Sequence, residues 1–135
     1  MTQDIRVRKV AWMPVKDHKV LFARSKKEEK IFYCVGGKIE PGETKEEALM
    51  REVKEETGVV LNRASIKHLK TFIGPSHTGG TMEMIIFAAD PLFKQEPVPS
   101  SEVAELAWFT TADKHRTTEM GEMILDWYHQ QGLID

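Results

Sequence analysis

Two absences narrow the kinds of protein that this chain can be. It has one cysteine, Cys34, in 135 residues, and no run of 18 apolar residues occurs in it. One cysteine cannot close an internal disulfide, and no cysteine and histidine cluster has zinc-site spacing, so nothing indicates a secreted scaffold or a zinc site. The N-terminus lacks the apolar segment of a signal peptide. We therefore expect a cytoplasmic protein with no membrane partner.

An excess of charge of either sign is also lacking. Lys and Arg number 19 against 21 Asp and Glu, a net charge of -2. This balance argues against the broad cationic field with which proteins bind nucleic-acid polymers or anionic membranes. The composition, 41% hydrophobic and 30% charged, is that of a globular protein. The length suits one domain, which we predict over residues 1–135.

Strands are predicted where apolar and β-branched residues run between turn residues. The predicted strands are 5–15 and 20–24, joined as a hairpin by a polar turn, then 31–35, 65–73, 81–89 and 105–109. Gly36 and Gly37 are expected to end the third strand and begin a loop. A last helix is predicted to start near Thr118. Its predicted face carries Met120, Ile124, Trp127 and Gln131.

Between these strands lies a helix with clear end signals. Thr44 and Glu47 match a capping box, and Gly58 stands where a left-handed residue would end the helix. These signals predict a helix over residues 45–57. Strands, a helix, more strands and a final helix indicate an α/β (α+β) fold, with a mixed sheet covered by helices on its faces.

The helix carries three carboxylates on one stripe, at Glu52, Glu55 and Glu56. Positions three and four apart are neighbours on a helix, so these like charges repel by a few tenths of a kcal/mol per pair, roughly. One interpretation is a solvated acidic face, since Glu-rich helix surfaces are common. The other is a site for a hard divalent cation such as Mg²⁺, which prefers oxygen ligands and often shares them with substrate phosphates.

The preceding loop favours the cation site. Three glycines and Glu43 stand just before the helix, and glycine lets the backbone approach a ligand closely. The loop is not a Walker phosphate-binding loop, because Phe32 and Ile39 occupy positions that need Gly and Ser or Thr. The segment from Gly37 to Val59 fits Gly-x5-Glu-x7-Arg-Glu-U-x-Glu-Glu-x-Gly-U, where U is aliphatic, with no fixed position missing.

This pattern is the box of the Nudix hydrolase family, and the chain resembles MutT-like members of that family over the box and, more loosely, over nearly its whole length. The resemblance implies a Nudix fold, an α/β/α sandwich around a mixed sheet. It also implies Mg²⁺- or Mn²⁺-dependent hydrolysis of a nucleoside diphosphate linked to another group.

The resemblance also assigns roles within the box. Glu55 and Glu56 resemble the main metal-ligand carboxylates, Glu52 a further ligand or the general base, and the Gly36 carbonyl a backbone ligand. Glu43 resembles a loop carboxylate that assists the metal site. Arg51 is similar to an arginine that orients the box glutamates by ion pairing, a role that suits its planar fork.

Residues outside the box are implied less directly. In this family the general base is a box glutamate or a carboxylate from a distant loop, and Glu102 and Glu105 lie in the corresponding region. Arg24 resembles a basic residue placed against substrate phosphates, and Lys38 is a second candidate for phosphate contact. Each also has an interpretation as an ordinary surface side chain.

The resemblance leaves the substrate open. We expect a small nucleotide, either a nucleoside triphosphate cleaved to monophosphate and pyrophosphate, or ADP-ribose or a nucleotide sugar. The segment typical of NADH-cleaving members, Ser-Gln-Pro-Trp, is missing. A non-catalytic nucleotide-binding module is the alternative of a different class, although binding alone would not require the full acidic stripe. Tyr33 is expected in strand packing or base stacking. His77 is expected in a glycine-rich loop, either solvated or in reach of a ligand. A homodimer is left open.

Overall fold

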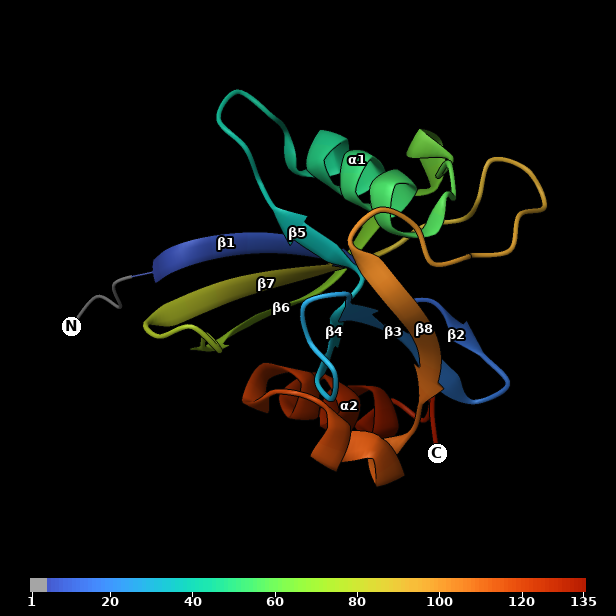
Figure 1. Cartoon of the computed structure of the whole chain (residues 1–135). Coiled ribbons are helices and arrows are strands. Elements are labelled where there is room, and N and C mark those ends of the chain that lie inside the picture. Colours follow the sequence, from blue (N-terminus) through green and yellow to red (C-terminus); the bar gives the residue numbers. More distant parts are fainter. Residues whose placement is uncertain (1–4) are drawn as a thin grey trace.

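The computed structural model describes residues 5–135, in which two four-stranded sheets lie between two helices (Figure 1). The first sheet has the order β5 (Gly36–Lys38), β1 (Ile5–Trp12), β7 (Thr81–Ala88) and β6 (Lys67–Pro75). In it β1 and β7 are parallel, and the other neighbours are antiparallel. The sheet is therefore mixed, as the order of elements in the sequence predicts.

The second sheet is antiparallel and centres on β3 (Lys19–Ser25). The other strands, β2 (Val15–Lys16), β4 (Phe32–Cys34) and β8 (Val103–Phe109), all pair with β3. A backbone hydrogen bond from Trp12 to the Val35 carbonyl, 2.8 Å long, joins the two sheets where β4 gives way to β5. The predicted hairpin therefore consists of β2 and β3, while β1 belongs to the other sheet.

Two strands, β1 and β3, contribute buried residues to two separate cores, one on each face. Along β1, Val10 and Trp12 belong to one core while Ala11 belongs to the other. In β3, Leu21 packs in the first of these and Phe22 in the second. Since neighbouring strand residues point to opposite faces, continuous apolar runs are what a sheet layer covered on both sides requires. The result is the α/β/α arrangement predicted from the sequence.

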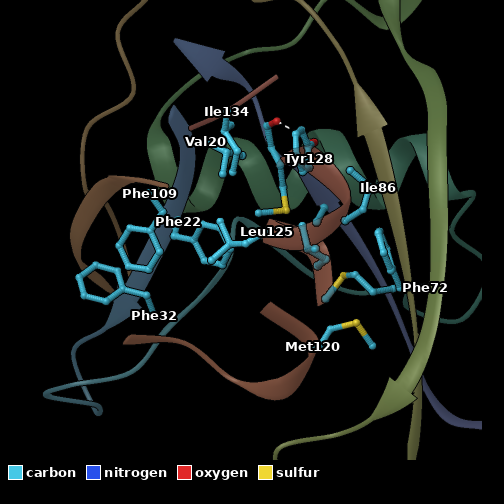
Figure 2. Close-up of a cluster of buried hydrophobic side chains, with 14 of the residues drawn as sticks. Val20, Phe22, Phe32, Phe72, Ile86, Phe109, Met120, Leu125, Tyr128 and Ile134 are labelled. Carbon is cyan, nitrogen blue, oxygen red and sulfur yellow. Dashed lines mark hydrogen bonds between the residues drawn. The ribbon is translucent and has the colours of Figure 1, made fainter. Parts of the chain in front are cut away.

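One core lies between the sheets and the helix α2 (Glu119–Gln130) (Figure 2). Phe22, Phe32 and Phe109 gather on one side of it, and the Phe22 and Phe109 rings stack with centroids 4.8 Å apart. The predicted start of α2 is confirmed, since Thr118 is its N-cap. Its buried face includes Met120 and Ile124 as predicted. Gln131 is exposed, however, and the face continues instead through Leu125 and Tyr128.

The other core lies under the helix α1 (Lys45–Thr57), which packs beside β1 and β5 (Figure 1). The predicted bounds of α1 and both of its end signals are confirmed. The Thr44 hydroxyl accepts from the Glu47 amide at 3.1 Å, and the Glu47 carboxylate accepts from the Thr44 amide at 3.0 Å. Gly58 ends the helix with φ 74°. Leu49 and Val53 fix the buried face of α1.

Several strand boundaries differ from the predictions for local reasons. The strand predicted over 5–15 ends at Trp12, and a tight turn with positive φ at Asp17 and His18 returns the chain from β2 to β3. Asn62 caps a short 3-10 helix, Arg63–Ser65, so β6 starts two residues late. A second 3-10 helix, Thr111–Arg116, precedes α2. Within residues 5–135 no helix has the length and apolar character needed to cross a membrane.

Gly36 and Gly37, expected in a loop, form most of β5 and pair with β1. This expectation is wrong: the absence of side chains at these glycines allows β5 to lie very close to β1. A β-carbon on Gly36 would lie 1.9 Å from the Val10 carbonyl oxygen. Without side chains, the segment lies flat against β1 and brings its backbone under α1.

Candidate active site

Arg51 is at the centre of the charged groups on α1. Its Nε and Nη2 donate to the two carboxylate oxygens of Glu43 at 2.6 and 2.9 Å, a bidentate pair. Its Nη1 donates to Glu52 Oε1 at 2.8 Å and lies 3.7 Å from Glu55 Oε2. Hydrogen bonds from Arg51 hold the pKa of Glu43 down at about 2, and these carboxylates raise the pKa of Arg51. Arg51 therefore joins three of the carboxylates into one network.

Glu56 lies one helical turn after Glu52 and faces inward. The Gly36 amide donates to Glu56 Oε1 at 3.2 Å, which ties the helix to β5. Burial, followed by the hydrogen bond and charge of Glu52, raises the pKa of Glu56 far above its usual range. Two adjacent carboxylates in this setting are stable together only when a proton or a cation offsets their repulsion.

Because Gly37 has no side chain, the Glu52 carboxylate can lie directly against the backbone at this position. A β-carbon at Gly37 would lie 2.4 Å from Glu52 Cδ and 2.6 Å from both carboxylate oxygens. The Glu52 side chain, 16% exposed, therefore packs directly on the backbone of β5. Any residue larger than glycine at position 37 has to displace it.

This donor set fits a divalent cation that prefers oxygen. Carboxylates are the ligands that Mg²⁺ takes in proteins, and a cation would relieve the repulsion between Glu52 and Glu56. In the described conformation Glu52 turns toward Arg51, and the Glu55 side chain is 52% exposed. Among residues 5–135, no three His, Cys, Asp or Glu side chains lie close enough together to hold a metal ion in this conformation.

A pocket of about 450 Å³ opens beside Glu56. Its walls come from β1 and β7 of the first sheet, from β3, β4 and β8 of the second, and from the start of α2. Gly36 and Glu56 form part of its lining, so the inward carboxylate of α1 reaches the pocket directly. A volume of this size is typical of small-molecule sites.

The model of the NUDIX domain family matches residues 5–127. The chain belongs to the Nudix hydrolase family. The match covers both sheets and most of α2, and the box from Gly37 to Val59 contains the charged network around Arg51. Its members are hydrolases that generally use divalent metal cations.

Curated Nudix relatives have two different activities. Over 97 residues the chain is 33% identical to the NAD-capped RNA hydrolase NudC of Haemophilus influenzae, an alignment that covers 69% of this chain and 35% of NudC. The chain thus aligns with about a third of the length of that relative. It is also 33% identical over 111 residues to the nucleoside triphosphatase NudI of an Enterobacter species, covering 73% of this chain and 74% of NudI.

Solved Nudix structures share the fold. The MutT NUDIX hydrolase of Burkholderia pseudomallei superposes with a TM-score of 0.71 at 23% identity, covering 89% of this chain and 95% of that one. The dihydroneopterin triphosphate pyrophosphohydrolase of E. coli superposes with a TM-score of 0.67 at 18% identity, covering 94% and 97%. These likenesses support the same two-sheet, two-helix arrangement.

The two carboxylates considered as outer bases lie in different surroundings in this Nudix domain. Glu102, just before β8, lines the pocket that also contains Glu56. Glu105, within β8, pairs with Arg24 Nε at 3.1 Å and is absent from the pocket lining. Glu102 therefore lies in the pocket, whereas Glu105, three residues later, is held in an ion pair.

Arg24 and Lys38, the expected phosphate contacts, lie outside the pocket lining. Besides its pair with Glu105, Arg24 donates from Nη1 to the Glu28 carbonyl at 2.8 Å and so holds the loop after β3. The Lys38 side chain is exposed, and its carbonyl accepts from Arg51 Nη2 at 3.1 Å.

Two lysines that sequence reasoning missed do line the pocket. Lys9 lies on β1 between residues that face the core, and Lys27 lies in the loop held by Arg24. For Lys9 the sequence carries a signal, because Val7, Lys9 and Ala11 share one strand face and a lysine on an apolar face is unusual. Lys27 stands in a charged loop, where nothing in the sequence distinguishes it.

Proposed function

We propose that this Nudix hydrolase cleaves a diphosphate bond of a nucleoside triphosphate, with release of a nucleoside monophosphate and pyrophosphate. The charge of the pocket carries the proposal. Lys9 and Lys27 line it together with three carboxylates, Glu28, Glu56 and Glu102. The carboxylates of this pocket would repel a polyphosphate that carries no cation. They would accept a polyphosphate bound to divalent cations, and nucleoside triphosphates are bound to Mg²⁺ in this way.

The residues have separate parts in this proposal. Glu52, Glu55 and Glu56, with the Gly36 carbonyl, would hold Mg²⁺ or Mn²⁺, which supplies charge neutralisation and a bound water of lowered pKa. Arg51 and Glu43 keep Glu52 in position. Lys9 and Lys27 contact the phosphate oxygens. We assign proton removal from the attacking water to Glu102, because it is the outer carboxylate that lines the pocket.

Similarity to NudI supports a triphosphate, because the aligned region covers 74% of that relative. A second candidate is a substrate in which the diphosphate joins a nucleoside to a sugar or to another nucleoside, as in ADP-ribose. The similarity to NudC favours it, since the name of that relative specifies NAD-capped RNA.

Product analysis separates the candidates. Nucleoside triphosphates, ADP-ribose and nucleotide sugars are incubated with the protein and Mg²⁺, with an EDTA control, and products are identified by chromatography. We expect monophosphate and pyrophosphate from triphosphates, and no turnover in EDTA. Cleavage of ADP-ribose or sugars alone would favour the second candidate, and orthophosphate as the only inorganic product would contradict the proposed bond.

The assignment of Glu102 has a matched control three residues away. We expect Glu102→Gln to lower kcat by about 10²- to 10⁴-fold, the usual contribution of a general base, with the Mg²⁺ dependence kept. Glu105→Gln, the same change in the ion-paired carboxylate, should keep most of the activity. Equal activity of the two variants would return the role of base to a box glutamate.

A further inference from the structure

The loop between β3 and β4, residues 26–31, carries groups that line the pocket but has no buried anchor of its own. Lys27 and Glu28 are part of the pocket lining, and none of the six residues of the loop is buried. Five of the six side chains are charged. A loop without buried apolar contacts keeps one position only if hydrogen bonds hold it. We call this segment the pocket loop.

Arg24, the next-to-last residue of β3, holds the pocket loop at Glu28. Its Nη1 donates to the Glu28 carbonyl at 2.8 Å, and its Nε donates to Glu105 Oε1 at 3.1 Å. Arg24 and Glu105 are partners in the register of β3 with β8, which lie side by side (Figure 1), so the carboxylate braces the guanidinium. The Arg24 side chain is only 22% exposed. A planar guanidinium makes both bonds at fixed angles, whereas an ammonium group has no such fork.

A second hydrogen bond joins the pocket loop to Glu102. The Lys26 amide donates to the Glu102 carbonyl at 2.8 Å. Just before this point, between Arg24 and Ser25, the pairing of β3 with β8 shifts its register. Irregularities of this kind interrupt regular pairing and redirect side chains. The place of Glu102 in the pocket therefore depends on the pocket loop as well as on β8.

We infer that Arg24 is a positioning residue, which acts through the pocket loop to keep Lys27 and Glu102 in the pocket. The inference rests on the proposed function, in which Lys27 contacts phosphate and Glu102 takes the proton of the attacking water. Arg24 itself lies outside the pocket lining, and its Nε and Nη1 are both bonded to protein oxygens. This role differs from the direct phosphate contact expected from the sequence.

The hold on the loop is tested by hydrogen exchange, which does not depend on turnover. Residues 26–31 should exchange faster in Arg24→Lys than in the unmodified protein, while exchange in α1 stays the same. Arg8→Lys is the matched control, because Arg8 Nε donates to Glu83 Oε1 across β1 and β7 at 3.0 Å and both residues lie outside the pocket lining. Unchanged exchange of the pocket loop in Arg24→Lys would overturn the inference.

A double-mutant cycle with Glu102→Gln distinguishes positioning from direct contact with the substrate. Alone, Arg24→Lys should lower kcat at least about tenfold, since ångström-scale misplacement of a catalytic group is costly. In the Glu102→Gln protein it should lower kcat by less than about threefold, because the base that it would misplace is already lost. Arg8→Lys should leave kcat unchanged. Equal losses from Arg24→Lys in the two backgrounds would mean that Arg24 acts independently of Glu102 and would overturn its positioning of the base.

The control variant of the base leaves the brace in place. Glu105→Gln keeps an oxygen that can accept from Arg24 Nε, so the pocket loop should exchange at the same rate in Glu105→Gln as in the unmodified protein. Faster exchange in this variant would show that the loop depends on the charge of the pair rather than on the hydrogen bond, against the geometry argued here.

A binding cycle keeps failure of the inference distinct from failure of the proposed reaction. Pyrophosphate with Mg²⁺ is the probe, measured by calorimetry. Arg24→Lys should weaken its binding in the unmodified protein but not in Lys27→Ala, because the lysine that the loop positions is then missing. If this result is found but no triphosphate is cleaved, the positioning of Lys27 stands and the proposed reaction fails. Equal weakening in both backgrounds would mean a direct contact from Arg24 and would overturn the inference.

Discussion

Glu52 is the most constrained side chain of the site. Arg51 holds one of its oxygens at 2.8 Å, and the backbone at Gly37 leaves no room for a β-carbon beside it. Glu56 is the second carboxylate, and burial raises the pKa of this side chain. Small changes at these positions should therefore affect chemistry before they affect folding.

The first prediction concerns Gly37→Ala. The added methyl group would lie 2.4 Å from Glu52 Cδ, so the carboxylate has to move, while the backbone keeps an ordinary conformation. We expect turnover to fall at least about tenfold, since ångström-scale misplacement of a catalytic group is costly. The melting temperature should change little, because the displaced atoms are the end of a flexible side chain. Full activity would show that Glu52 works equally well elsewhere.

The second prediction concerns pH and Glu56. Folding raises the pKa of the Glu56 carboxyl. The contribution of this group to the unfolding free energy is therefore fully present below its pKa in the unfolded chain, and it is lost as the pH rises from that value toward the pKa in the folded protein. In EDTA, we expect unfolding free energy to decline from about pH 5 to pH 8 more in the unmodified protein than in Glu56→Gln. Urea unfolding at several pH values measures this. Parallel profiles of the two proteins would contradict the assignment.

At the scale of elements, α1 carries the three glutamates proposed to hold the cation, Glu52, Glu55 and Glu56. Its start depends on the two reciprocal hydrogen bonds between Thr44 and Glu47. Its C-terminal end depends on Gly58 in the left-handed conformation. Both devices are local, so they can be tested without touching the carboxylates.

The third prediction therefore concerns Thr44→Ala. Removing the cap hydroxyl leaves the Glu47 amide without its partner and should lower the unfolding free energy by about 1 kcal/mol. Urea denaturation should show a lower midpoint with an unchanged slope. Thr44→Ser keeps the hydroxyl and serves as the control. Equal losses in both variants would mean that the methyl group of Thr44, rather than the cap, supplies the stability.

The same distinction between local and distant interactions explains what the sequence could predict. The bounds of α1 and the N-cap of α2 depend on residues a few positions apart, and both predictions are confirmed. The pairing of strands depends on residues far apart, so the sequence could not show that β1 pairs with β5 and β7 rather than with β3. Nor could it distinguish Glu102 from Glu105, because the ion pair of Glu105 with Arg24 and the place of Glu102 in the pocket both join residues far apart in the sequence.

At the scale of the whole molecule, the two cores share their strands. Val10 and Ala11 are adjacent in β1 and belong to different cores, and Leu21 and Phe22 do the same in β3. Neither core can lose its packing without disturbing the strands that the other needs. We therefore expect the chain to unfold in one cooperative transition, as small domains usually do.

The last prediction tests this coupling through Tyr128. Its hydroxyl donates to the Met13 carbonyl at 3.0 Å and thereby fastens α2 to the link between β1 and β2 (Figure 2). Tyr128 and Met13 are 1% and 2% exposed, and burial raises the pKa of Tyr128, so the hydroxyl stays a donor. Tyr128→Phe leaves a buried carbonyl without this partner and should lower the unfolding free energy by about 1–3 kcal/mol.

Tyr33→Phe is the control, because it removes the same atom from a partly exposed ring with no hydrogen bond to its hydroxyl within residues 5–135. Trp12 lies in the core under α1, and Trp127 packs against the core on the α2 side. Tryptophan fluorescence and far-ultraviolet circular dichroism should therefore shift to the same new midpoint in Tyr128→Phe. If the two signals separated, unfolding would not be one cooperative transition, and the shared strands would not couple the cores.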